Sequence, residues 1–174
     1  HVEGATLYRS RQSYQAIFRN NTSLDGGYIM GVNQDYFSIA GLTIKQGRGI
    51  TEDDNKKFRQ VAVLDETSAK LLFGEENPIG KTIEISSTPF TIVGVCADKE
   101  TFEPTMESID DYHTYNQSTG SKVYVPSESW PIFYQFDEPQ NALLKVDATS
   151  NMTRVGKEAA TILNTNVSSS SVQY

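Results

Sequence analysis

The sequence has a single cysteine among its 174 residues and lacks any long hydrophobic run. One thiol, Cys96, cannot form a disulfide within the chain. It lies in the apolar strand pattern of residues 91–97, and free cysteine is among the most buried residue types, so we interpret it as a buried, unreactive thiol. No apolar run approaches the roughly 18–20 residues of a membrane-spanning helix. We therefore expect these residues to fold in water.

Clustered positive charge is also absent. The chain has 15 basic and 22 acidic residues, which gives a net charge of −7. Nucleic acids and anionic membranes attract clustered Lys and Arg, so neither is expected as the main partner. The sequence has no initiator methionine, signal peptide or lipidation motif. It opens at His1, and we expect it to be a segment of a longer protein.

Recognisable catalytic motifs are missing as well. There is no Gly-x-Ser-x-Gly elbow and no Walker loop. Residues 98–121 form a long loop with six carboxylates, but Phe102 and Pro104 occupy positions that an EF-hand fills with ligands, and His113 lacks a His or Cys partner. A solvated acidic loop is the favoured interpretation; a metal-dependent hydrolase is the alternative. We predict no catalytic residue, no metal site and no cofactor, and therefore no enzyme.

What is present is a series of short strands and helices separated by caps and turns. Asn33, Asp65 and the capping-box spacing of residues 51–54 predict helix starts, and Gly41 predicts a helix end. The mixture predicts an α+β fold. The expected strands lie within residues 5–19 and at residues 28–32, 42–44, 61–64, 81–85, 90–97, 122–125 and 142–146, with a turn at 86–89; the expected helices lie at 34–40, 66–73 and 151–163.

The aromatic segment at residues 130–136 has two interpretations. A helix packed in the core is favoured, because folded domains bury most large aromatic side chains. An exposed recognition patch is the alternative, since Trp and Tyr dominate binding hot spots. Trp130, Phe133 and Tyr134 are the candidate residues for contact with a partner or ligand.

Six short motifs follow one another between residues 31 and 95. They are Gly-Val-Asn-Gln-Asp-Tyr-Phe, Gly-Arg followed by Thr-Glu-Asp-Asp, Val-Ala-Val-Leu, Leu-Leu-Phe-Gly, Pro-Ile-Gly-Lys and Val-Gly-Val. In this order they resemble the extracytoplasmic core domain of MacB-like ABC transporter permeases, a family that includes the FtsX-like permeases. The resemblance is close over residues 28–97 and looser over 122–164. The structural motif residues are Gly47, Arg48, Phe73, Gly74, Pro78, Gly80 and Gly94.

This resemblance implies a two-lobed domain on the extracytoplasmic side of the cell membrane, between two transmembrane helices. Residues 1–30 and 138–174 would form a porter-like α/β lobe that is incomplete at its N-terminal side. Residues 31–137 would form a smaller, strand-rich lobe inserted into it.

The implied function is non-catalytic: the domain transmits ATP-driven motion and contacts cargo or partner proteins. The implied partners are an ABC ATPase, reached through the membrane helices, and a peptide, drug or lipoprotein cargo or an extracytoplasmic protein. The full-length protein would be membrane-embedded and dimeric. The alternative is a ligand-sensing domain that binds a peptide or amphiphile such as an antimicrobial peptide.

Overall fold

The computed structural model describes residues 1–13, 16–98, 120–134 and 140–165. Its helices are short apart from the last, and two of them are 3-10 helices. They are α1 (Tyr36–Ile39), α2 (Glu52–Lys56), α3 (Glu66–Phe73), η1 (Ser127–Ile132), η2 (Thr149–Asn151) and α5 (Met152–Asn164). The strands are β1 (Val2–Ser13), β2 (Ile17–Arg19), β3 (Thr22–Ser23), β4 (Gly27–Val32), β5 (Leu42–Gly47), β6 (Val61–Asp65), β7 (Thr82–Ile85), β8 (Thr88–Asp98), β9 (Lys122–Pro126) and β10 (Asn141–Val146).

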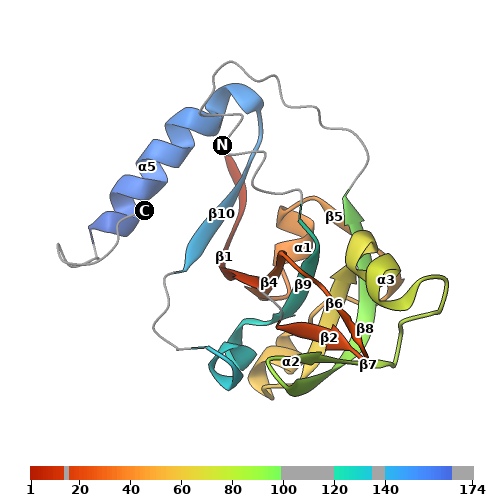
Figure 1. Cartoon of the computed structure of the whole chain (residues 1–174). Coiled ribbons are helices and arrows are strands. Elements are labelled where there is room, and N and C mark those ends of the chain that lie inside the picture. Colours follow the sequence, from red (N-terminus) through yellow and green to blue (C-terminus); the bar gives the residue numbers. More distant parts are fainter. Residues whose placement is uncertain (14–15, 99–119, 135–139, 166–174) are drawn as a thin grey trace.

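The strands form one hydrogen-bonded path in the order β10-β1-β4-β9-β6-β8-β7-β2-β3, with β5 also paired to β8 (Figure 1). Most neighbours are antiparallel, but β4 runs parallel to β9 and β6 runs parallel to β8. This sheet-dominated mixture of strands and helices confirms the predicted α+β class.

Strand β1 belongs to two strand pairs. Its first part, from Val2 to Tyr8, is antiparallel to β10, and its second part, from Arg9 to Ser13, is antiparallel to β4. Figure 1 shows β10 and α5 together at one side of the molecule, away from α2 and α3. The division into lobes of residues 1–30 with 138–174 and of residues 31–137 stays a prediction.

Both faces of the central sheet are covered, because successive side chains of a strand point to opposite faces. On β9, Val123 and Val125 join an apolar cluster with α3 and Trp130, whereas Tyr124 joins a second cluster with α1. Cys96 is fully buried in the second cluster. Burial raises the pKa of its thiol to about 12, as expected for an unreactive core residue.

Local capping was predicted correctly at two helices and incorrectly at one. The side chain of Thr51 accepts from the Asp54 N–H, and that of Asp65 accepts from the Ser68 N–H at 2.7 Å. Asn33, by contrast, does not cap α1, which begins after Asp35. The Asn33 side chain instead accepts from the Asp35 N–H at 3.1 Å, a local turn that asparagine readily forms.

Three further element predictions need correction. The β7–β8 turn contains only Ser86 and Ser87, both at positive φ (49° and 66°), because such a two-residue turn matches the right-handed twist of the strands. The aromatic segment opens as a 3-10 helix, η1, with Pro131 inside it rather than as an α-helix. On α5, the helical spacing predicts one apolar face that includes Val155 and Ile162, but Val155 is buried whereas Ile162 is 66% exposed. Phe136, most of the acidic loop and residues after 165 lie outside the described residues.

The Gly-Arg and Val-Gly-Val motifs meet where β5 and β8 pair. Gly47 lies opposite Gly94 in the register, and the Arg48 N–H donates to the Val93 carbonyl at 2.8 Å. A Cβ atom on Gly47 would lie 2.1 Å from the Val93 oxygen, and one on Gly94 would lie 2.0 Å from the Arg48 oxygen. Both positions therefore require glycine for the close approach of two backbones.

Replacing Gly47 should destabilise the domain more than replacing a glycine that has the same backbone conformation but open surroundings. Gly47 has φ +66°, so Gly47→Ala combines left-handed strain with the overlap against Val93 and should cost about 2–5 kcal/mol. Gly41 has φ +72° with nothing nearby, so Gly41→Ala should cost only about 1 kcal/mol. Urea unfolding of both variants measures the difference, and equal losses would contradict the close-approach account.

Candidate functional site

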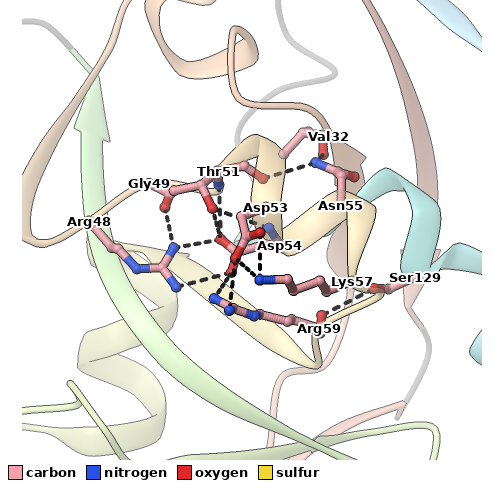
Figure 2. A network of polar contacts seen from close by, with 10 residues as sticks. All are labelled: Val32, Arg48, Gly49, Thr51, Asp53, Asp54, Asn55, Lys57, Arg59 and Ser129. Atoms are coloured by element: carbon pink, nitrogen blue, oxygen red, sulfur yellow. Dashed lines mark hydrogen bonds and ion pairs between the residues drawn. The ribbon is translucent and has the colours of Figure 1, made fainter.

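The arginine of the Gly-Arg turn pairs with a fully buried carboxylate (Figure 2). Arg48 Nη1 lies 2.6 Å from Asp54 Oδ2, and Arg48 Nη2 lies 3.1 Å from Asp54 Oδ1. This two-pronged geometry is the strong form of an Arg–carboxylate pair. Arg59 Nη1 adds a third contact, 3.4 Å from Asp54 Oδ1.

The capping box completes the surroundings of Asp54. Its Oδ2 accepts from the Thr51 N–H at 2.9 Å and from the Thr51 hydroxyl at 2.8 Å. Burial alone would raise the pKa of Asp54, but the hydrogen bonds from Arg48 and Thr51 outweigh it and lower the pKa to about 2. The carboxylate is therefore ionised at neutral pH and engaged on both oxygens, which suits a structural anchor rather than an acid or a base.

The same network ties α2 to two other elements. Asn55 Nδ2 donates to the Val32 carbonyl at the end of β4, at 3.5 Å, and Asn55 Oδ1 accepts from the Glu128 N–H at the start of η1, at 3.2 Å. The Ser129 hydroxyl donates to the Arg59 carbonyl at 3.1 Å, as Figure 2 also shows. This network thus joins the turn after β5, helix α2, strand β4 and η1.

A second group of motif residues surrounds the end of α3. Arg19 lies over the ring of Phe73 at 4.1 Å and donates to the Leu72 carbonyl at 3.0 Å. Glu76 pairs with both Arg19 and Lys81. Three residues of the Leu-Leu-Phe-Gly and Pro-Ile-Gly-Lys motifs shape the turns here. Gly74 (φ +60°) ends α3. The N–H of Gly80 (φ +78°) donates to the Ile92 carbonyl, and the Pro78 carbonyl accepts from the Lys81 N–H.

Of the three aromatic candidates, Trp130 is fully buried, and Phe133 and Tyr134 are partly buried beside it. The Trp130 and Tyr134 ring centroids are 4.9 Å apart, and the Arg11 guanidinium lies 4.5 Å from the Tyr134 centroid. A Cβ on Gly31 would lie only 2.8 Å from the indole of Trp130. This burial agrees with the favoured core interpretation of Trp130. A partner contact at the three residues stays a prediction.

An apolar cleft of about 440 Å³ lies between β1, β10 and α5. Its volume falls within the range of small-ligand pockets. Sequence reasoning missed it because its walls come from both ends of the chain and no local pattern joins them. Its lining includes Ala5, Leu7, Ala142, Leu144, Ala159 and Leu163, with the hydrogen-bonded pair Thr6 and Asn33 beside them.

Within residues 1–13, 16–98, 120–134 and 140–165, no group of three or more His, Cys, Asp or Glu side chains could hold a metal ion. In the same residues, none of the helices has the length and apolar character to cross a membrane. The features found are turns, anchored carboxylates and an apolar cleft. All of them are carried by one sheet-based scaffold.

Comparison with known proteins identifies the family of this domain. The family model described as the MacB-like periplasmic core domain matches residues 2–162, and the chain belongs to that family. This confirms the resemblance seen in the six motifs. The homology supports an extracytoplasmic domain of a MacB-like ABC transporter permease.

Three relatives show how far the similarity extends. YvrN, an uncharacterized ABC transporter permease of Bacillus subtilis (strain 168), is 30% identical over 172 residues, which are 99% of this chain and 40% of YvrN. The macrolide export ATP-binding/permease protein MacB of Aggregatibacter actinomycetemcomitans is 39% identical over 102 residues, 52% of this chain and 16% of MacB. The crystal structure of the periplasmic region of MacB from Actinobacillus actinomycetemcomitans has a TM-score of 0.68 and 26% identity, covering 94% of this chain and 67% of that one. The chain thus spans less than half of the two curated relatives.

Neutralising the buried carboxylate should destabilise the domain in a pH-dependent way. Asp54→Asn should cost about 2–4 kcal/mol at pH 7, because Arg48 loses its buried partner. The folded pKa of Asp54, about 2, lies below the ordinary value of 3.8. The contribution of Asp54 to the free energy of unfolding is therefore complete above about pH 5, and it is lost as the pH falls from about 4 toward 2.

Urea unfolding of the wild-type domain and the variant between pH 7 and pH 2.5 tests this expectation. Asp53→Asn is the matched control, since the neighbouring Asp53 side chain is 48% exposed and its removal should change stability little. A wild-type advantage over Asp54→Asn that stays constant down to pH 2.5 would contradict the anchoring role.

Proposed function

We propose that this chain is a non-catalytic extracytoplasmic domain that transmits ATP-driven motion within an ABC transporter permease and contacts cargo or partner proteins. The family match over residues 2–162 carries the proposal. The anchored state of Asp54 adds support for a non-catalytic role, because its oxygens are engaged by Arg48 and Thr51.

The pairing of β1 provides a route for motion. β10 leads directly into η2 and α5, and β1 is hydrogen-bonded to β10 over Val2–Tyr8 and to β4 over Arg9–Ser13. A displacement of the β10–α5 side is therefore passed along one continuous strand into the central sheet. The Gly47–Gly94 approach and the Asp54 network make the receiving part stiff, so that it moves as a unit.

The partners that we propose follow from the relatives. MacB is an ATP-binding/permease protein by name, and this chain covers only 16% of it. The ATP-driven partner that we propose is an ABC ATPase that acts through membrane helices. The cargo is a peptide, drug or lipoprotein, or the domain contacts an extracytoplasmic protein. We propose a dimeric, membrane-embedded full-length protein with this domain on the extracytoplasmic side.

Interrupting β1 should separate ATP hydrolysis from transport. Two glycines inserted between Tyr8 and Arg9 preserve the alternation of side chains but add flexibility between the β10-paired and β4-paired parts. In the full-length permease, we expect ATP hydrolysis to persist while the permease-dependent phenotype is lost. That phenotype is the difference in growth between strains with and without the permease gene under macrolide or antimicrobial-peptide challenge.

The matched control is the same insertion between Asn20 and Asn21, the exposed turn of the β2–β3 hairpin, which lies off the proposed route. A permease from which the whole domain is deleted defines complete loss of the permease-dependent phenotype. A wild-type phenotype after the deletion would overturn the proposed function, and a wild-type phenotype after the Tyr8–Arg9 insertion alone would overturn the route through β1.

A second candidate function is ligand sensing, and the apolar cleft beneath α5 favours it. The cleft of about 440 Å³ is lined mainly by Ala, Leu and Ile side chains, which suit the apolar face of a peptide. The net charge of −7 would attract a cationic molecule. We therefore propose a cationic amphipathic peptide, such as an antimicrobial peptide, as the ligand of this alternative.

Such a peptide should raise the melting temperature of the isolated domain. At a hundredfold excess over the Kd, mass action predicts a rise of about 5 °C or more. Ala159→Trp fills the cleft from α5 and should abolish the rise. A scrambled peptide of equal charge is the control for non-specific attraction. No rise with the amphipathic peptide, or an equal rise in Ala159→Trp, would exclude the sensing function at this cleft.

A further inference from the structure

A polar cavity of about 280 Å³ lies where four strands, β5, β6, β8 and β9, begin or end. It shares no lining residue with the apolar cleft beneath α5. Its charged lining residues are Asp65 at the end of β6, Asp98 at the end of β8 and Lys122 at the start of β9. Two carboxylates and one lysine give this lining one net negative charge.

The inner part of the cavity is formed by buried side chains of one face of the sheet. Tyr124 lies two residues after Lys122 on β9, and Cys96 lies two residues before Asp98 on β8, so each pair shares a face. Tyr124 and Cys96 both line the cavity and are buried in the same apolar cluster, whereas Asp98 is exposed. The cavity therefore leads from a charged rim to a buried phenol.

The hydroxyl group of that phenol is not used by the fold. Tyr124 is only 2% exposed, yet no described residue forms a hydrogen bond with its hydroxyl. Its ring packs against Tyr36 and Phe37, with centroids 5.8 Å and 5.3 Å away. A phenylalanine would make the same ring contacts. Because a buried tyrosine hydroxyl usually has a partner, the oxygen indicates a partner that enters from the cavity.

The carboxylates of the rim act on the same hydroxyl. Burial is the main cause that raises the pKa of Tyr124, and the charges of Asp65 and Asp98 raise it further, so the phenol is protonated and lies near both carboxylates. The Asp98 side chain has no hydrogen bond or ion pair with any described residue. Asp65 accepts from the Ser68 N–H at 2.7 Å and from the Lys122 N–H at 3.0 Å, and its oxygens have further lone pairs.

A primary ammonium group matches these acceptors. It carries a positive charge and three N–H donors, and oxygens of Asp98, Asp65 and Tyr124 are available to accept them. An anion would meet two carboxylates. Among the described residues, no group of three or more His, Cys, Asp or Glu side chains could hold a metal ion. Leu42 adds an apolar wall for a short alkyl chain, and the volume of about 280 Å³ limits the ligand to a small molecule.

We propose that this cavity binds a small primary amine, whose ammonium group donates to Asp98 and to the Tyr124 hydroxyl and lies close to Asp65. The bound amine would connect β8 to β9, the two strands that flank β6 in the sheet. This site goes beyond the proposed function and does not depend on it.

Titration of the 174-residue chain with n-butylamine tests the binding. This amine is protonated at pH 7, as a lysine side chain is. We expect saturable changes in the amide chemical shifts of residues that line the cavity, measured by NMR at constant ionic strength. n-Butanol has the same chain without the charge, and n-butyltrimethylammonium has the charge without N–H donors. Both should bind at least 10-fold more weakly than n-butylamine.

Tyr124→Phe separates binding from folding. The variant keeps the ring contacts and loses only a hydroxyl that has no partner, so its melting temperature should equal or exceed that of the wild-type domain. Its affinity for n-butylamine should fall at least 10-fold. Tyr8→Phe is the matched control, because Tyr8 packs against the same apolar cluster but does not line the cavity, and it should leave the affinity unchanged.

Asp98→Asn tests the carboxylate and should also weaken the binding of n-butylamine at least 10-fold. Glu84→Gln is its matched control: Glu84 is an exposed carboxylate on β7 outside the cavity, and its neutralisation changes the net charge equally. The affinity of Glu84→Gln should equal that of the wild-type domain.

The inference would be overturned by an absence of saturable shift changes with n-butylamine, or by equal binding of n-butanol or n-butyltrimethylammonium. Unchanged affinity in Tyr124→Phe or in Asp98→Asn would overturn it too. A lower melting temperature of Tyr124→Phe would show that the hydroxyl serves the fold, which contradicts the proposed site as well.

Discussion

The arrangement of the domain depends on the two-sided pairing of β1. Among the described residues, no other strand pairing joins β10 to the rest of the sheet. The cleft beneath α5 has one wall from β1, and the central sheet begins where β1 turns to pair with β4. In the function that we propose, this continuous strand couples the two parts mechanically, because its backbone cannot shift in one pairing without disturbing the other.

The central sheet receives that strand as a stiff body for two reasons. The close approach of Gly47 and Gly94 fixes how β5 lies on β8, since a side chain at either position would meet backbone. Asp54 then holds Arg48, the next residue along, to α2, and Asn55 and Ser129 extend the connection to β4 and η1. The motifs that mark the family in sequence are thus the anchors of this body, which explains why they are rich in caps and turns and poor in reactive groups.

The sequence predicts those features of the fold and the site that depend on residues close together in the chain, and it does not predict those that depend on residues far apart. The Thr51–Asp54 capping box and the cap at Asp65 depend on residues three apart, and the sequence predicts both correctly. The role of Asp54 as an anchor depends on its ion pairs with Arg48 and Arg59, which lie outside the capping box, so a helix-cap pattern does not reveal it. The cleft joins residues 5–7 to residues 142–163, which no short motif connects. Phe58 opposes the local rule that favours glycine after a helix, so only the structure reveals its conformation.

The central claim, that ATP-driven motion reaches this domain, can be tested by the height of the domain above the bilayer. A fluorophore on a cysteine placed at the exposed position 71 transfers energy to acceptor-labelled lipid headgroups in proteoliposomes that contain the full-length permease and its ATPase; the buried Cys96 should react little. The account predicts a reversible change in transfer efficiency between the nucleotide-free and ATP-trapped states. The same efficiency in both states, with ATP hydrolysis intact, would contradict it.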